Sequence, residues 1–407
     1  MNKTELVAAM AKETNLSKKD VEAVLKSFTD VVADELKKGM RLAKPIYNKN
    51  GVMLYERDSR LTEQGIISIQ NFGLIGIYVL EPAEPVPPMS AEDIEFERYQ
   101  TMAVFAIKEI LDAVSKQKPS AKLNTFVTQL VQKYGSLDHK INFIQNLRSV
   151  EDYVYKHSLN TALLCAMMAK RMNLSEKNQT DLVTAAVLHD IGTLLIPIGL
   201  RRKSQLELTE EDLKKINTYY VAAYQMFSRD YSLDAGVKMI LSVALRRIFH
   251  VGGKDDEMEK KKIPEVEILR TAYIYDQLTA MNIQEEPTSD VQAIRFLLDA
   301  GNGYDRVAVQ ALIHSINILE PGVCVELTNG DKGLVIIPGM YNVLQPYVLS
   351  FRDNQVYNLS TPHVAAQLQI KDIMRTMDNR HVMGIDMLKQ YSGEAVHIGE
   401  YRDNKTY

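Results

Sequence analysis

Hydrophobic residues recur at three- and four-residue intervals through most of this chain, which is the spacing of one face of an α-helix. In the first 38 residues this spacing predicts two short amphipathic helices around a polar break, where Ser17 and Asp20 have capping-box spacing. Gly39 follows the second helix and predicts its end. From about residue 91 to residue 320 the pattern is helical, and the predicted helices cover 91–116, 120–148, 151–172, 175–190, 209–229, 233–250, 263–282, 288–300 and 304–317.

The pattern changes to that of β-strands in two other regions. Residues 41–56 predict a hairpin around Asn50-Gly51, and a short helix over 61–73 and a strand over 74–80 follow it. Four prolines within 81–90 predict a semi-rigid connector. Strand-like runs return near the end of the chain, at 322–328, 333–338, 347–351 and 356–360.

These patterns predict a mainly α fold class, in which an all-helical domain has a small α/β module before it and a small β unit after it. An amino-terminal helical hairpin precedes the module. The predicted boundaries are 1–39 for the hairpin, 40–80 for the module, 81–91 for the proline-rich linker, 92–320 for the helical domain, 321–360 for the β unit and 361–407 for a tail without a predicted structure.

The composition narrows the class of protein. Of the 407 residues, 46% are hydrophobic and 25% are charged, which predicts a packed globular interior. The formal net charge of −4 gives no reason to expect nucleic acid or an anionic membrane as a partner of the whole protein. The two cysteines, Cys165 and Cys324, lie far apart and have no partner at metal-ligand spacing. Since no signal peptide and no membrane-spanning run is found either, we expect a cytoplasmic protein without membrane contact.

The stretch "AAVLHDIGTLLIP" (185–197) places His189 and Asp190 side by side at the end of an apolar run. His157 lies 32 residues before His189, on a predicted helix that can run alongside this one. Imidazoles and carboxylates suit iron, manganese or zinc, and such an ion can activate water for phosphoester hydrolysis. A structural interpretation is also open, with His157 as a hydrogen-bonded core histidine and His189 with Asp190 as a pair that caps a helix.

Further segments occur in a recognisable order, namely "GMRLAKPIYNKNGVMLY", "KHSLNTALLCAMMAKRMNLS", "AAVLHDIGTLLIP", "LTEEDLKKI", "YIYDQLTAM" and "LEPGVCVELTNGDKGLVI". Over roughly residues 39–360 the chain thereby resembles the HD-GYP subfamily of the HD metal-dependent phosphohydrolases. Active members of that subfamily hydrolyse the bacterial second messenger cyclic di-GMP. The resemblance implies that His157, His189 and Asp190 are metal ligands, and that Asp190 is also catalytic if the domain is active.

The chain departs from that subfamily at most of its other ligand positions. Thr193 stands where a lysine would face a phosphate, Tyr219 stands for a histidine, and Tyr273 stands for a ligand aspartate. The residues 243–246 replace paired histidines and a glutamate, and the Gly-Tyr-Pro signature is missing from the sequence. Asp276 matches a subfamily position that we do not take to be a ligand. We therefore expect a catalytically degenerate domain, to which a divalent metal (Fe, Mn or Zn) binds weakly or not at all.

The function favoured by these departures is non-catalytic: a signalling protein that binds a cyclic dinucleotide or a partner protein. Arg246 and Arg247, together with the basic residues 201–203, are candidates for binding phosphate, and a solvated surface is the alternative for them. The second hypothesis is a residual phosphohydrolase that uses one metal, held by the ligand residues named above.

Residues 1–39 closely resemble the opening helices of the HU/IHF histone-like DNA-binding proteins, although the β-saddle and the basic arms of that family are missing from the sequence. The seven lysines of this segment are balanced by seven acidic residues, so it has no net positive charge with which to release counterions from DNA. We therefore expect homodimerisation or simple packing from it, and association with DNA is the third hypothesis.

Overall fold

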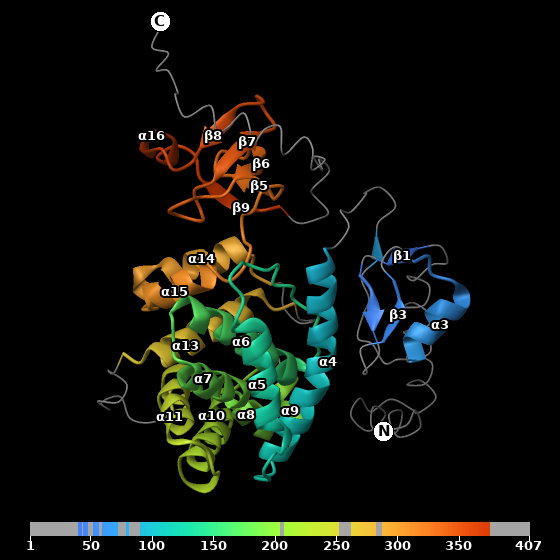
Figure 1. Cartoon of the computed structure of the whole chain (residues 1–407), viewed down its shortest axis with the longest axis vertical. Coiled ribbons are helices and arrows are strands. Elements are labelled where there is room, and N and C mark those ends of the chain that lie inside the picture. The colour runs from blue at the N-terminus through green and yellow to red at the C-terminus, as the bar shows by residue number, and fades with distance from the viewer. Residues whose placement is uncertain are drawn as a thin grey trace, which may run out of the picture. The chain divides into compact units, whose positions relative to one another are not determined.

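The computed structural model describes residues 40–42, 44–47, 52–56, 59–71, 79–80, 90–203, 207–251, 262–281 and 287–374. The chain divides into two compact units, residues 1–90 and residues 91–407 (Figure 1). The predicted hairpin of residues 1–39 lies outside the described residues, and so do the Asn50-Gly51 turn and most of the predicted linker.

The first unit contains two small pairs of antiparallel strands and one helix. Strand β1 (Arg41–Leu42) pairs with β4 (Val79–Leu80), and β2 (Ile46–Tyr47) pairs with β3 (Met53–Tyr55). Helix α3 covers Glu63–Asn71. Buried residues of this unit, Leu42, Ile46, Leu61 and Ile66, form its small core. The predicted pairing of the two runs within 41–56 is therefore confirmed.

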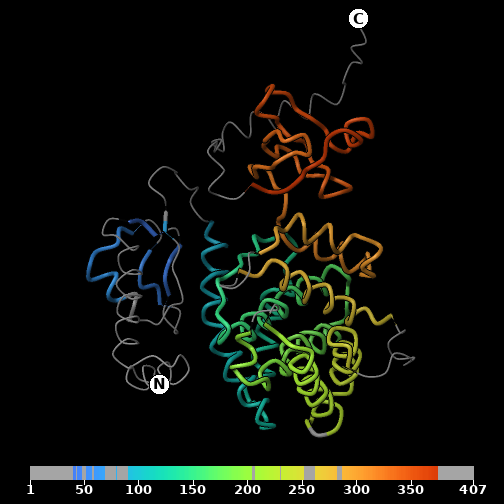
Figure 2. Tube along the Cα trace, turned by 180° about the vertical axis from the view of Figure 1, so that it is seen from behind, coloured from blue at the N-terminus to red at the C-terminus, as the bar shows by residue number. Residues whose placement is uncertain are grey.

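The second unit is mostly helical, as predicted, and Figures 1 and 2 show its helices stacked around one another. Its helices are α4 (Ala91–Val114), α5 (Lys122–Tyr134), α6 (Tyr153–Arg171), α7 (Glu176–Leu188), α8 (Ile191–Leu195), α9 (Ile198–Arg201), α10 (Glu210–Gln225), α11 (Ala235–Phe249), α13 (Pro264–Thr279), α14 (Asp290–Leu298) and α15 (Arg306–Ile313). A π-helical turn, Met226–Asp230, extends α10, and a short 3₁₀ turn, Ala300–Asn302, follows α14. No helix of the described residues is long and apolar enough to cross a membrane.

Local capping residues fix where several of these helices begin. The side chains of Ser175, Ser289 and Asp305 each accept a hydrogen bond from a backbone N–H of the first turn that follows. Thr209 and Asp212 form a reciprocal capping box at the start of α10. Such caps satisfy backbone donors that have no partner within the helix, and each stabilises the helix start by about 0.5–2 kcal/mol.

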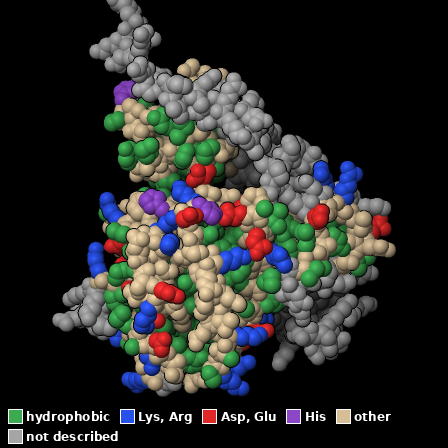
Figure 3. Space-filling model, in the orientation of Figure 1, with side chains coloured by type: hydrophobic (Ala, Val, Ile, Leu, Met, Phe, Trp, Pro, Cys, Tyr) green, Lys and Arg blue, Asp and Glu red, His purple; other side chains and the backbone are tan. Residues whose placement is uncertain are grey.

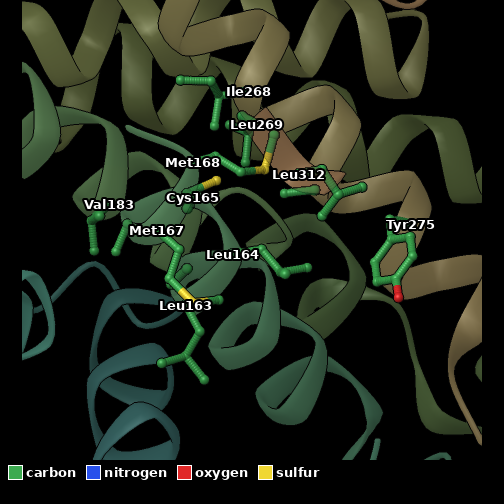
Figure 4. Packing of buried hydrophobic residues seen from close by; sticks show 14 of the residues in the cluster. Leu163, Leu164, Cys165, Met167, Met168, Val183, Ile268, Leu269, Tyr275 and Leu312 are labelled. Carbon is green, nitrogen blue, oxygen red and sulfur yellow. The ribbon is translucent and has the colours of Figure 1, made fainter. Parts of the chain in front are cut away.

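Helix α6 is the centre of the hydrophobic core, because it is buried around almost its whole circumference. Figure 4 shows Leu163, Leu164, Met167 and Met168 of this helix among side chains from three neighbouring helices, including Val183, Ile268, Leu269 and Leu312. Cys165 lies in the same layer as a free thiol, and both cysteines are buried. A helix enclosed in this way places any polar side chain that it carries inside the protein.

The prediction of one helix over 120–148 was wrong. Helix α5 ends at Tyr134, and Gly135 follows it where an added Cβ would lie 2.7 Å from the Val131 carbonyl oxygen. The chain then runs in irregular form to α6, with Ile141 bridged to Ile316. The apolar residues of this segment have helix-like spacing, but long-range contacts hold them in an extended path.

A five-stranded antiparallel sheet follows the helices, in the order β8-β7-β6-β5-β9. Its strands are β5 (Cys324–Leu327), β6 (Lys332–Ile337), β7 (Tyr347–Ser350), β8 (Val356–Asn358) and β9 (Ile370–Ile373), and a short helix, α16 (Pro362–Ala365), precedes β9. The sheet therefore extends beyond residue 360, where the sequence suggested its end. Helix α14 holds β9 in place, since Arg295 Nη1 donates to the Lys371 carbonyl oxygen at 2.6 Å.

Candidate functional site

His189 and Asp190 form the junction between α7 and α8, and both are buried, with exposed fractions of 0% and 3%. His157 lies on α6, which packs directly against α7 (Figure 1), and it is 1% exposed. The Nε2 atoms of His157 and His189 are 3.3 Å apart. The structure therefore brings together the three residues that the sequence singled out. We refer to them as the His-Asp cluster.

The Nδ1 atom of each imidazole, which lies on the other side of the ring from Nε2, has a hydrogen-bond acceptor within the protein. His189 Nδ1 lies 2.7 Å from the carbonyl oxygen of Ala186, which can only accept, so this nitrogen carries a proton and donates. His157 Nδ1 lies 2.6 Å from Asp276 Oδ2 and donates to that carboxylate. Hydrogen bonds of this kind fix the ring orientation and the tautomer, so both Nε2 atoms point inward toward each other.

Asp276 belongs to a buried ion pair that the sequence did not predict. Arg148 donates from Nη1 to Asp276 Oδ2 at 2.7 Å and from Nη2 to Oδ1 at 2.6 Å, and both side chains are 0% exposed. The amide groups of Asn160 and Gln145 also donate to Oδ1. Burial alone would raise the pKa of Asp276, but the charge of Arg148 and these hydrogen bonds hold it well below its usual value.

Asp190 has a different environment. Its Oδ1 accepts a hydrogen bond from the Thr193 hydroxyl at 2.5 Å, and that hydroxyl also lies 3.0 Å from the Tyr220 hydroxyl. Burial raises the pKa of Asp190 to about 6, although the charge of His157 and the Thr193 hydrogen bond act in the opposite direction. The side chain of α10 that reaches this position is thus Tyr220, one residue after the Tyr219 that the resemblance indicated.

Aromatic rings surround the His-Asp cluster. The ring of Tyr273 meets the His157 and His189 rings edge-on, at centroid distances of 4.9 and 5.5 Å. Phe249 contacts Tyr273 and stacks on Tyr220 at 4.0 Å. Tyr273, for which the resemblance implies the position of a ligand aspartate, is packed as an aromatic side chain against both imidazoles.

The segment that should carry paired histidines and a glutamate belongs to the core instead. Val243, Ala244 and Leu245 are at most 2% exposed. Arg246 Nη2 donates to the Tyr224 hydroxyl at 2.6 Å, and Arg247 forms an ion pair with Glu267. Since both arginines already have protein partners, a phosphate would compete with those partners for them. The binding of phosphate by Arg246 and Arg247 stays a prediction.

We tested whether these side chains could hold the divalent metal implied by the resemblance. The inward Nε2 atoms of His157 and His189 suit two neighbouring positions around one ion, because ligand nitrogens lie about 2.0–2.1 Å from such a metal. In the part of the chain that the structure describes, however, no three His, Cys, Asp or Glu side chains form a group that could hold a metal. The donors present therefore do not fit a pair of adjacent ions.

Comparison with known proteins gives the family of two regions. Residues 141–307 match the HD domain family, and residues 1–45 match the bacterial DNA-binding protein family. The chain is 24% identical over 198 residues to cyclic di-GMP phosphodiesterase PdeB of Borreliella burgdorferi, over 48% of this chain and 52% of that protein. It is 20% identical over 273 residues to cyclic di-GMP phosphodiesterase PA4108 of Pseudomonas aeruginosa, over 64% of this chain and 63% of that protein.

A solved structure of Bd1817, a HDG"Y"P protein from Bdellovibrio bacteriovorus, is similar with a TM-score of 0.43 and 14% identity, over 68% of this chain and 95% of that one. The chain spans 52% and 63% of the length of the two curated relatives. The matches and the structure together confirm the predicted fold class. Residues 141–307 of this chain are therefore similar to HD domains, including those of cyclic di-GMP phosphodiesterases, and residues 1–45 are similar to the bacterial DNA-binding protein family.

Proposed function

We propose that this protein is a non-catalytic relative of the cyclic di-GMP phosphodiesterases, which binds a nucleotide or a partner protein in a signalling pathway. The observation that carries the proposal is the set of side chains around the His-Asp cluster, where Tyr273, Phe249 and Tyr220 supply aromatic rings. An octahedral ion takes about six donors, and two imidazoles with one carboxylate are too few for two such ions.

The charge balance of the site supports the same proposal. The carboxylate of Asp276, to which His157 donates, is neutralised by the guanidinium of Arg148. A buried ion pair with several hydrogen bonds can hold its neighbours in one arrangement without any further ion. The packing around His157 therefore has an organising group of its own within the protein.

The test is metal content together with hydrolysis. The full chain would be purified under nitrogen, its iron, manganese and zinc measured per chain, and its activity on cyclic di-GMP followed by chromatography with each metal added. We expect well below one ion per chain and no turnover. His250→Ala is the matched control for His189→Ala, because His250 is exposed at the end of α11. Turnover that survives His250→Ala and disappears in His189→Ala would overturn the proposal.

The second candidate is a phosphohydrolase that uses one metal. The two inward Nε2 atoms favour it, since the acceptors behind them fix both imidazoles in the orientation of ligands. Since the three residues do not form a metal-binding group as they stand, Asp190 would have to move toward the two imidazoles; an ion held by His157, His189 and Asp190 would then supply an activated water for attack on a phosphoester. This candidate predicts one ion per chain that survives dialysis and is released by Asp190→Ala. An ion-free wild-type protein that stays folded would exclude it.

The match of residues 1–45 to the bacterial DNA-binding family favours a third candidate, association with DNA. Against it, lysines and arginines are mixed with acidic side chains on the face of the helical unit shown in Figure 3. Deleting residues 1–38 should leave retention on DNA unchanged at moderate salt if the segment serves dimerisation, and should reduce the oligomer size in light scattering. We also propose a cytoplasmic location, because a buried free thiol such as that of Cys165 suits a reducing compartment.

A further inference from the structure

The basic residues that follow α8 differ in whether their charges have partners. Arg202 pairs with Glu151 at 2.7 Å, and Lys203 pairs with Asp212 at 2.7 Å. Arg201, at the end of α9, donates from Nε to the carbonyl oxygen of Ile196 at 3.1 Å, which is its one hydrogen bond within the described part of the chain. Its Nη1 is buried and has no hydrogen-bond partner among the described residues.

A buried guanidinium N–H without an acceptor is unfavourable, because it has lost its hydration and gained nothing in exchange. Side-chain groups of this kind are normally satisfied, so an orphaned donor is a place where an acceptor from outside the described residues would be stabilising. The Nε bond to Ile196 ties Arg201 to the segment that follows Asp190, and the charge of Arg201 acts on the Asp190 carboxyl group. The guanidinium is therefore anchored on the segment that follows the cluster, and one of its N–H donors has no acceptor among the described residues.

We propose that Arg201 binds a phosphoryl oxygen of the ligand. It would take the role of the lysine that the resemblance implies at position 193, where this chain has Thr193. It would also replace Arg246 and Arg247, which the sequence suggested as the phosphate-binding residues. A guanidinium suits this task, because it offers several N–H donors in a fixed plane to a tetrahedral oxyanion. The inference deepens the nucleotide-binding form of the proposed function and rests on it. It says that the ligand carries a phosphate group and that Arg201 is the residue that binds this group.

The experiment measures the binding of fluorescently labelled cyclic di-GMP to the full chain by anisotropy. Arg201→Met should weaken binding about tenfold or more, which corresponds to one charged hydrogen bond. Arg201→Lys keeps the charge and should recover part of the loss. Arg352→Met is the matched control and should change binding by less than about twofold, since the Arg352 side chain is 72% exposed and lies after β7, outside the candidate phosphate-binding residues. Far-UV circular dichroism of each variant checks that it is folded.

Calorimetric titration with pyrophosphate separates this inference from the proposed function. Binding of labelled cyclic di-GMP that is equal in wild type and a folded Arg201→Met overturns the inference and leaves the proposed function standing. If wild type binds pyrophosphate in an Arg201-dependent manner but not cyclic di-GMP, the anion contact stands and this nucleotide is excluded as the ligand. If wild type binds neither probe, both the contact and the nucleotide-binding function are overturned.

Discussion

The ion pair between Arg148 and Asp276 allows a sharp test of what holds the site together. Both side chains are fully buried, and the guanidinium meets the carboxylate through two hydrogen bonds. Arg148→Met keeps an unbranched side chain in the core but removes the positive charge, so the Asp276 carboxylate loses its cationic partner. Breaking a buried pair by removing one member costs about 3–5 kcal/mol, because the remaining charge stays buried.

Urea unfolding followed by far-UV circular dichroism measures this cost. The chain has no tryptophan, and the helices of the second unit dominate the dichroism signal. With an unchanged slope, the shift of the midpoint multiplied by that slope gives the change in the free energy of unfolding. Arg202→Met is the control, because its pair with Glu151 is exposed and exposed pairs contribute about 0–1 kcal/mol.

A double-mutant cycle with Asp276→Asn completes the test. Each single variant leaves one charge buried without its partner, whereas the double variant removes both charges. If the charges act as a pair, the loss of stability in the double variant is therefore clearly smaller than the sum of the two single losses. A loss below about 1 kcal/mol for Arg148→Met would refute the reasoning. In that case the neutral donors of Gln145 and Asn160, with His157, would satisfy the carboxylate without Arg148.

Four further predictions concern the same unit. The folded-state pKa of Asp276 lies below its unfolded value near 4. The ionised carboxylate therefore contributes stability above the unfolded pKa, and this contribution is lost as pH falls through the folded pKa. In Asp276→Asn the free energy of unfolding should consequently fall less steeply with decreasing pH than in the wild type. Gly192→Ala should destabilise by about 1–3 kcal/mol, because the new Cβ would lie 2.5 Å from Tyr220 Cδ1, and Tyr220→Ala should relieve that loss. Leu164→Ala should cost about 2–5 kcal/mol in urea unfolding, whereas Met340→Ala, at a side chain 85% exposed, should stay within about 0.5 kcal/mol. Arg295→Ala should speed hydrogen exchange of the Met374 amide, which follows β9 and donates to the Cys324 carbonyl oxygen of β5, because Arg295 of α14 donates to β9. Unchanged protection of this amide would contradict the idea that α14 holds β9 in place.

The sequence predicted the His-Asp cluster because its residues lie on consecutive helices of strong periodicity. A break between α6 and α7 makes those helices antiparallel neighbours, which places His157 opposite His189. Arg148 could not be found in this way. Its position depends on an irregular segment whose path is set by distant partners, including the hydrogen bond from its own backbone N–H to Met281 O at 2.8 Å. Local spacing carries no information on such partners.

Two smaller differences have similar causes. Consecutive residues on a helix point about 100° apart, so a shift of one position decides that Tyr220 and not Tyr219 reaches Thr193. Strand β9 lies in a polar stretch without a clear alternation, and its pairing with β5 and its contacts with α14 make it a strand. In both cases the tertiary environment selects among local structures that the sequence permits.

The two histidines and the aspartate do not by themselves indicate a metal centre, because each side chain already makes one hydrogen bond within the protein. His157 donates to Asp276, His189 donates to a backbone carbonyl, and Asp190 accepts from Thr193. These bonds leave the two Nε2 atoms facing each other at 3.3 Å, and two neutral acceptors at that distance repel unless a proton or a cation lies between them. Burial and the neighbouring His157 lower the pKa of His189 to about 3. A positive charge on the His189 imidazole is therefore unfavourable. The choice between a structural pair and a single-metal site therefore depends on what occupies this one position, and metal content per chain measures it directly.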